Sequence, residues 1–286
     1  MTFAWHKPAS LPEAVALFGM NGGKVPIVAG GTDIVVQWRA GAIDPPGFID
    51  ISSVPEILAI EEEKGSIVIG AGVTHARIAS NEAVLAHLPV LARACLSIGA
   101  VQIQNRGTIG GNVMNASPAG DTLPVALACG ASMCAAGVKG ERWIPVEEFY
   151  TGYRRTSLAP DEMLAKIRFP KRDSKETAGF YKVGTRRAQA ISKVAMCARA
   201  RIRHGGIEWI RIALGSVAPT VVRCPGTEAL LAGKAINAAL IDLARQSIMD
   251  EVHPIDDVRS TADYRRFAAG ALLAKFLAEP RRQAGR

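Results

Sequence analysis

The sequence has 286 residues, of which 49% are hydrophobic and 21% are charged, a composition typical of globular proteins that excludes the disordered and fibrous classes. This length predicts two domains. The formal net charge is +8, but the arginines lie in short separated groups and only 6% of the residues are aromatic. This pattern argues against nucleic-acid binding, and an anionic cofactor or an acidic partner explains the charge equally well.

The first third of the chain predicts alternating helices and strands. Ser10-Leu11-Pro12-Glu13 is a capping box that predicts a helix over residues 11–20. A buried strand over 25–29, a Gly30-Gly31 turn, a short helix over 33–40 and a strand over 48–51 follow. Next come a strand over 67–70, helices over 74–80 and 89–98, and a glycine-rich loop over 107–112.

The rest of the chain predicts a different arrangement. A helix over 121–129 precedes strands over 131–136, 142–146 and 163–169, and the polar residues 171–177 form a candidate linker. Strands over 180–184, 194–203, 209–217 and 221–223 then suit an antiparallel sheet, and helices over 226–231, 236–252 and 261–278 end the chain. The fold class is therefore α+β, with a smaller sheet-and-helix domain at the C-terminus.

The cysteines and the chain ends indicate a cytoplasmic location. The five cysteines contain no C-x-x-C pair, so we expect buried free thiols and no metal site. The first eight residues lack the pattern of a signal peptide. The most apolar run, 123–138, is interrupted by Pro124 and Gly130 and is shorter than the ~20 residues of a membrane span, so no span is predicted.

Two glycine-rich segments are the strongest functional signal. One is Gly30-Gly31 between a strand and a helix, and the other is Gly107-Thr108-Ile109-Gly110-Gly111-Asn112. Backbone without side chains lets amide groups approach a ligand closely, and a helix start favours an anion. Neither segment is a Rossmann or P-loop motif, and each could serve only as a turn. Together they are typical of two loops that hold one diphosphate.

Other candidate residues are ambiguous on their own. Asp121 and Asp33 could cap the helices that follow them or contact a ligand, and Lys182 could be an ordinary outward-facing strand residue. The five histidines show no metal spacing, and no nucleophile motif is present. We therefore predict binding residues but neither catalytic residues nor metal ligands in this chain.

Four motifs in order make the chain similar to a known family. They are Ala29-Gly30-Gly31-Thr32-Asp33, Thr108-Ile109-Gly110-Gly111-Asn112 with Ala116-Ser117-Pro118 and Asp121, Gly152-Tyr153-Arg154-Arg155-Thr156 with Pro160-Asp161-Glu162, and Tyr181-Lys182 ahead of Arg186-Arg187. In combination they resemble the FAD-binding subunits of molybdenum hydroxylases, above all those of bacterial xanthine dehydrogenases, over essentially the whole chain.

The resemblance implies a fold and a set of cofactor contacts. It implies a two-subdomain FAD-binding domain of the vanillyl-alcohol-oxidase (PCMH) type over 1–172, with subdomains of about 1–55 and 56–172, and a CO-dehydrogenase-flavoprotein-like C-terminal domain over 178–286. Asp121 would contact the cofactor's hydroxyls, Leu164 would make a backbone or packing contact, and Lys182 would lie near the flavin ring. The diphosphate and its neighbours would be held by Ile27, Val28, Ala29, Gly30, Gly31, Thr32, Asp33, Ile34, Thr108, Ile109, Gly110, Gly111 and Asn112.

The resemblance also implies partners. A large subunit would carry the molybdenum cofactor and a small subunit the [2Fe-2S] clusters. This chain's FAD would pass electrons to an acceptor, for which a xanthine dehydrogenase-like enzyme implies NAD+. Ala188-Gln189-Ala190 stands where some relatives have acidic residues, and no four-cysteine insertion for a further cluster is present. The alternatives are a stand-alone flavin oxidoreductase of the same fold and a basic binding or assembly protein without flavin.

Overall fold

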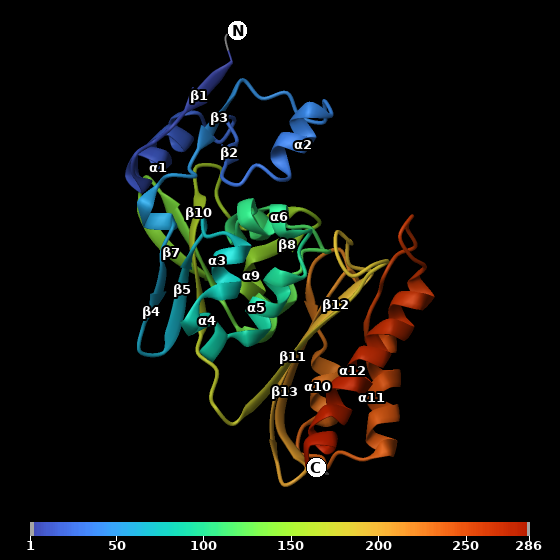
Figure 1. Cartoon of the computed structure of the whole chain (residues 1–286). Coiled ribbons are helices and arrows are strands. Elements are labelled where there is room, and N and C mark those ends of the chain that lie inside the picture. The colour runs from blue at the N-terminus through green and yellow to red at the C-terminus, as the bar shows by residue number, and fades with distance from the viewer. Residues whose placement is uncertain (1–2, 285–286) are drawn as a thin grey trace.

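The computed structural model describes residues 3–284. Its first layer is a small parallel sheet in the order β1-β3-β2, drawn at the top of Figure 1. Phe3, Trp5 and Trp38 pack around Phe48 on this sheet, with ring centroids 5.5–5.7 Å from that of Phe48. The elements of this part are β1 (Ala4–His6), α1 (Leu11–Met20), β2 (Ile27–Val28), α2 (Ile34–Arg39) and β3 (Gly47–Asp50).

The second layer is an antiparallel sheet in the order β4-β5-β10-β6-β7, with short helices on one side of it (Figure 1). Its strands are β4 (Ile60–Glu62), β5 (Ser66–Gly70), β6 (Ser132–Gly137), β7 (Gly140–Pro145) and β10 (Met163–Pro170). A separate two-stranded ribbon joins β8 (Tyr150–Gly152) and β9 (Arg155–Thr156). The helices are η1 (Pro55–Ile57), α3 (His75–Ser80), α4 (Glu82–His87), α5 (Pro89–Leu96), α6 (Val101–Arg106), α7 (Ile109–Met114), α8 (Leu123–Cys129) and α9 (Val146–Phe149).

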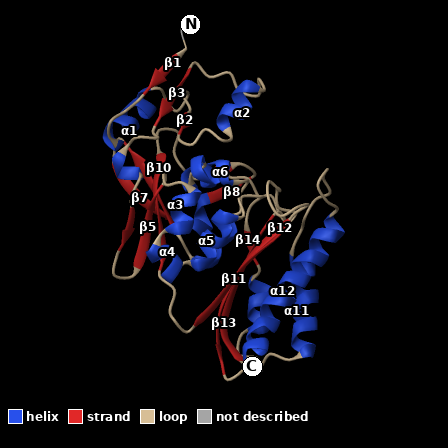
Figure 2. Cartoon of the chain, in the orientation of Figure 1, coloured by secondary structure: helices blue, strands red, loops and turns tan. Residues whose placement is uncertain are grey.

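The third layer is an antiparallel sheet in the order β11-β12-β13-β14, backed by long helices (Figure 2). One face packs on α5 and α8, and the other packs on α10 and α12. Its elements are β11 (Glu176–Val183), β12 (Val194–Arg203), β13 (Gly206–Gly215), β14 (Val222–Arg223), α10 (Pro225–Leu231), α11 (Ala238–Glu251) and α12 (Ala262–Ala284). The predicted α+β class, with a smaller C-terminal sheet and helices, is confirmed.

Most predicted elements exist, and the main difference concerns the second glycine segment. The predicted loop over 107–112 is largely the helix α7. Glycine disfavours helix, but Thr108 caps α7 by accepting from the Gly111 amide at 3.0 Å, and Ile109 and Val113 are buried in the core. Capping and burial therefore outweigh the low helix propensity of two glycines.

The candidate linker is shorter than predicted. Only residues 171–175 lie between β10 and β11, because Glu176 and Thr177 already pair with Arg201 and Ala200 in the next strand. The predicted domain boundaries fall at this connection and remain a prediction. None of the helices in residues 3–284 combines the length and the apolar character that a membrane crossing requires.

Candidate functional site

The two glycine segments line one cavity of about 490 Å³, here called the glycine cavity. They also touch each other directly, since a Cβ atom on Gly30 would lie 2.0 Å from the carbonyl oxygen of Arg106. Glycine at position 30 therefore lets the two segments meet, as well as leaving the backbone bare. The predicted residues on the cavity wall are Ile27, Ala29, Gly30, Gly31, Thr32, Asp33, Ile34, Thr108, Gly111 and Asn112.

The first segment presents open backbone amides. Within residues 3–284, no acceptor lies in hydrogen-bonding position for the N–H groups of residues 30–34, and the next donor is Val35, which bonds to the Gly31 carbonyl. Gly31 has φ +74°, a conformation that glycine adopts without strain. A run of unpaired N–H groups on a cavity wall is a site for a ligand that only accepts hydrogen bonds, above all an anion.

The second segment differs from this expectation. The amides of Ile109, Gly110 and Gly111 donate to the Val73 carbonyl, the Ala71 carbonyl and the Thr108 hydroxyl. A Cβ atom on Gly110 would lie 2.6 Å from both Cβ and the carbonyl oxygen of Ala71. This glycine therefore serves packing inside the protein rather than the approach of a ligand.

Three more predicted residues lie behind the wall. Val28 and Ile109 are buried in the core, and Leu164 lies in β10 opposite Ala135. None of these residues lines the glycine cavity or the neighbouring cavity described next. They fix the position of the wall through packing.

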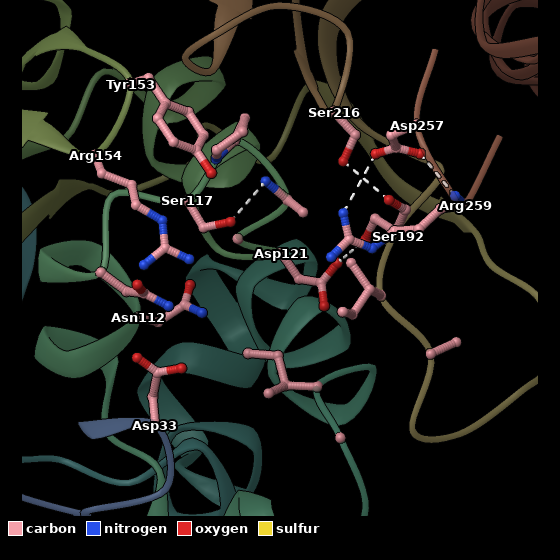
Figure 3. Close-up of a pocket in the computed structure, with 18 of the residues that line it drawn as sticks. Asp33, Asn112, Ser117, Asp121, Tyr153, Arg154, Ser192, Ser216, Asp257 and Arg259 are labelled. Carbon is pink, nitrogen blue, oxygen red and sulfur yellow. Dashed lines mark hydrogen bonds and ion pairs between the residues drawn. The ribbon is translucent and has the colours of Figure 1, made fainter. Parts of the chain in front are cut away.

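A larger cavity of about 800 Å³, here called the central cavity, continues from the glycine cavity. Figure 3 shows the Arg154 guanidinium group pointing into it from the side of Asn112 and Asp33. The opposite wall comes from loops that flank the C-terminal strands, including Ser192 and Ser216, and from Arg265 at the start of α12. The two cavities share Asp33, Ile98, Ile103, Asn112, Asn115 and Arg154, so they form one continuous space.

Strained backbone surrounds the central cavity. Arg154, Gln189 and Ser216 line it with φ of 53°, 52° and 66°, and Ala116, with φ 46°, adjoins Ser117 on its wall. Such conformations cost of order 1 kcal/mol or more in non-glycine residues and persist where the surrounding structure holds them, often at functional sites. Sequence reasoning named Arg154, Ala116 and Gln189 only within family motifs and missed Ser216.

Asp121 lines the central cavity and forms a buried ion pair with Lys182, which lines a separate surface pocket together with Ser97 and Arg186. Lys182 Nζ lies 2.6 Å from Asp121 Oδ2 and 2.8 Å from the Ser97 carbonyl oxygen, and the Ser192 hydroxyl donates to Asp121 Oδ1. The exposed fractions of the Asp121 and Lys182 side chains are 8% and 11%. Burial raises the pKa of the Asp121 carboxyl, and Lys182 and Ser192 oppose this rise by stabilising the charged form.

The three residues that were ambiguous in the sequence have defined contacts in the structure. Asp121 does not cap α8, whose N-cap residue is Thr122, and Lys182 is not an outward-facing strand residue. Asp33 occupies the N-cap position of α2 without a capping hydrogen bond, and its carboxylate accepts from Gln37 instead. Since Asp121, Lys182 and Ser192 are far apart in the sequence, no local signal could have predicted that they meet.

The far wall of the central cavity is held by Arg265, which is 4% exposed. Its guanidinium group donates to the Lys193 and Ser216 carbonyls at 2.9 and 3.0 Å and to Asp257 at 2.6 Å. Asp257 also accepts from Arg259 at 3.3 Å, and Figure 3 shows these two side chains next to each other. These contacts fix the C-terminal wall against the strained Ser216.

His75 also lines the glycine cavity and was missed in the sequence. It is 2% exposed, and burial lowers its pKa to about 4, so the ring is neutral near pH 7. Five scattered histidines gave no reason to select it. Within residues 3–284, no three His, Cys, Asp or Glu side chains are grouped to hold a metal ion.

The geometry fits an elongated anionic dinucleotide. Unpaired amides and His75 would face its phosphates in the glycine cavity, while the central cavity offers room and polar groups for a ring system. The groups on these walls, which are amides, hydroxyls and charged side chains, can bind such a ligand and act on it electrostatically.

Comparison with known proteins agrees with this geometry. Residues 1–172 match the family described as the FAD binding domain in molybdopterin dehydrogenase, and residues 179–280 match the CO dehydrogenase flavoprotein C-terminal domain. The chain is 33% identical to the carbon monoxide dehydrogenase medium chain of Hydrogenophaga pseudoflava, covering 96% of each chain. It is 28% identical to the xanthine dehydrogenase FAD-binding subunit of Escherichia coli O157:H7, covering 99% of this chain and 97% of that one. A solved carbon monoxide dehydrogenase from Hydrogenophaga pseudoflava superposes with a TM-score of 0.92 at 32% identity, covering 96% of each chain.

Proposed function

Because this chain belongs to the family of FAD-binding medium subunits of molybdenum hydroxylases, we propose that it is the electron-transfer subunit of such an enzyme. It would take electrons from the [2Fe-2S] clusters of a small partner subunit and pass them from FAD to an acceptor, with NAD+ the favoured candidate. Substrate oxidation would occur at the molybdenum centre of a large partner subunit.

The observation that carries the proposal is the row of unpaired amides at residues 30–34 on a cavity that continues into a larger one. These amides would bind the diphosphate of FAD, with Thr108, Gly111 and Asn112 on the facing wall. Val28, Ile109, Gly110 and Leu164 would support that wall from behind. Asp121 and Lys182 would lie near the flavin, where their charges act on it.

FAD accepts and donates one or two electrons, and the protein supplies binding, orientation and electrostatics. The central cavity would orient the ring between the Asp121–Lys182 pair and the strained segment that contains Gln189. The Arg265 contacts would keep the opposite wall in place. Arg154, at the junction of both cavities, would offset negative charge on the bound dinucleotide.

The NAD+ proposal rests on two points. The central cavity extends past the shared residues to Ile255, Asp257 and Arg259, which supports a second ligand beside the flavin, and one relative is a xanthine dehydrogenase subunit. We expect NADH to reduce the flavin of the purified chain under anaerobic conditions, measured as loss of absorbance near 450 nm. A flavin that dithionite reduces but NADH does not would contradict NAD+ as acceptor.

Cofactor binding is tested with a matched pair of glycine variants. Gly31 and Gly205 have φ of +74° and +77°, but only Gly31 lines the glycine cavity. We expect Gly31→Val to lose FAD and Gly205→Val, in the β12–β13 turn, to retain it despite similar backbone strain. If both variants retained the same amount of FAD, the proposed diphosphate site would be contradicted.

Co-purification distinguishes the remaining alternative. A stand-alone flavin oxidoreductase would turn over its own substrate as an isolated chain. An electron-transfer subunit should instead co-purify with molybdenum-containing and iron–sulfur subunits when its neighbouring genes are expressed with it. A basic protein without flavin does not agree with the family match over residues 1–172.

A further inference from the structure

His75 stands where the two glycine segments meet. Its backbone N–H donates to the Gly107 carbonyl at 3.0 Å, next to the bridge between Thr74 and Thr108. A Cβ atom on Gly107 would lie 3.3 Å from both His75 Cδ2 and the hydroxyl oxygen of Thr32. The ring is therefore held beside the first segment, whose amides are open.

The two ring nitrogens of His75 have different surroundings. Nδ1 is buried and has no hydrogen-bond partner within residues 3–284. A buried polar atom without a partner costs about 1–3 kcal/mol whether it donates or accepts. We therefore assign the ring proton to Nε2, the nitrogen that a bound ligand can reach. Nε2 is neither hydrogen-bonded nor among the buried unpaired atoms, so it is accessible. Since His75 lines the glycine cavity, we infer that Nε2 faces this cavity and can donate there.

A core histidine would satisfy its polar atoms with protein partners, and His75 does not. Its open donor lies on the same wall as the open amides of residues 30–34. All these groups donate and none accepts, so the ligand that completes them is an acceptor-only group. Burial keeps the ring neutral, as its lowered pKa of about 4 indicates.

We propose that His75 is a cofactor-binding residue whose Nε2–H donates a hydrogen bond to the diphosphate of FAD, completing the amide cradle of residues 30–34. This proposal rests on the proposed function, since it requires FAD in the glycine cavity. It adds to that function a side-chain donor contributed by α3.

Isosteric variants test which ring nitrogen matters. Gln places its amide nitrogen close to the position of Nε2, whereas Asn places it close to Nδ1. We expect His75→Gln to keep the Kd for FAD within about threefold of the wild type. His75→Asn and His75→Leu should weaken binding by about 10- to 100-fold, as expected for the loss of a hydrogen bond to a charged group. Equal Kd values for the Gln and Asn variants would overturn the proposal.

Ligand fragments test which part of FAD is contacted. Displacement of FAD by ADP or by riboflavin gives an inhibition constant for each fragment on the wild type and on His75→Asn. We expect the substitution to weaken the binding of ADP by about the same factor as the binding of FAD. The inhibition constant of riboflavin should stay within about twofold of its wild-type value. If the variant lost as much affinity for riboflavin as for ADP, the effect would be a general structural one. That result would overturn the proposed contact with the diphosphate.

A spectroscopic readout separates this inference from the proposed function. In ¹⁵N-labelled full-length chain, we expect the His75 signals, assigned by their absence in His75→Gln, to show the Nε2–H tautomer and to shift when FAD is added. If the wild type bound no FAD, the proposed function would fail. If the wild type bound FAD while His75→Leu bound it equally well, only the role of His75 would fail. Circular dichroism checks that each variant is folded.

Discussion

Asp121 and Lys182 compensate each other's charge inside the protein, with 2.6 Å between Lys182 Nζ and Asp121 Oδ2. A lone lysine near a flavin would stabilise the anionic reduced form and raise its potential. A paired lysine has much less effect, because the carboxylate offsets the field. With FAD bound as proposed, the flavin environment would therefore depend on the pair rather than on either residue.

We predict that Asp121→Asn raises the midpoint potential of the bound flavin, because Lys182 then remains uncompensated. Lys182→Met should lower the potential if Asp121 keeps its negative charge. It should leave the potential unchanged if Asp121 takes up a proton, which burial already favours by raising its pKa. Spectroelectrochemical titration of both variants measures the shifts. A rise in both variants would contradict this account.

Each single change also leaves a buried charge without its partner. Removing one member of such a pair costs about 3–5 kcal/mol. We expect the double variant Asp121→Asn/Lys182→Met to lose less free energy of unfolding than the two single variants lose together. Urea unfolding of all three variants in a double-mutant cycle measures these losses. Additive losses would mean that the two side chains act independently.

His75 gives a pH dependence with a definite sign. Its pKa is about 4 in the folded chain and about 6.5 when unfolded, so protons bind preferentially to the unfolded state. The stabilising contribution is therefore complete above about pH 6.5 and is lost as the pH falls toward 4. We predict that the free energy of unfolding falls less over this interval in His75→Gln than in the wild type. Identical pH profiles would contradict the buried neutral ring.

At the scale of elements, the glycines of the two segments serve different purposes. Gly30 and Gly110 let backbone segments pack against each other, whereas Gly111 meets only the Thr108 hydroxyl, 3.1 Å from where its Cβ atom would lie. Gly111 also lines the glycine cavity, and Gly110 does not. Changing Gly110 therefore disturbs the protein core as well as any ligand.

We predict that Gly30→Ala and Gly110→Ala each destabilise the protein by about 1–3 kcal/mol, as overpacking does. Gly111→Ala should change stability by no more than about 1 kcal/mol, since alanine favours helix and the single contact is tight but local. Chemical denaturation of the three variants without FAD provides the measurement. A loss for Gly111→Ala as large as for Gly110→Ala would contradict these assignments.

At the scale of the whole molecule, the C-terminal sheet is covered on both faces. Phe180, Ala195, Cys197 and Ala213 belong to the hydrophobic core that also contains α5 and α8, whereas Tyr181 and Met196 pack with the long C-terminal helices. The sheet is therefore not a separate unit that merely follows the cofactor-binding part. Its inner face depends on that part for burial.

We predict a single unfolding transition for the full chain. Circular dichroism and the fluorescence of its tryptophans, which include Trp143 in β7 and Trp209 in β13, should report the same midpoint, and FAD should raise it. A fragment starting at residue 173 should aggregate or bind a hydrophobic dye, because it exposes the inner face. Two separate midpoints would contradict the shared core.

Local patterns in the sequence determined much of the fold. The capping box at Ser10 marked α1 with its observed bounds, Leu11–Met20, and the alternation of Arg199 and Arg201 with alanine and isoleucine marked β12. Both signals depend on residues a few positions apart, so they are readable without the fold. The strand β1 and the short helices α4 and α6 were missed, although Asn81 caps α4 by accepting from the Val84 amide at 3.1 Å, because elements of three to six residues are too short to show a clear period.

The sequence by itself determined the family and the kind of ligand, because the glycine motifs and their order can be read directly from the amino-acid sequence. Only the tertiary structure decided which glycines face the cavity and which face the core, and that Asp121, Lys182 and Ser192 meet. It also decided that His75 lines the same wall as Gly31. The physical reason is that backbone propensity acts between near neighbours, whereas burial, ion pairing and unsatisfied donors depend on segments brought together by folding.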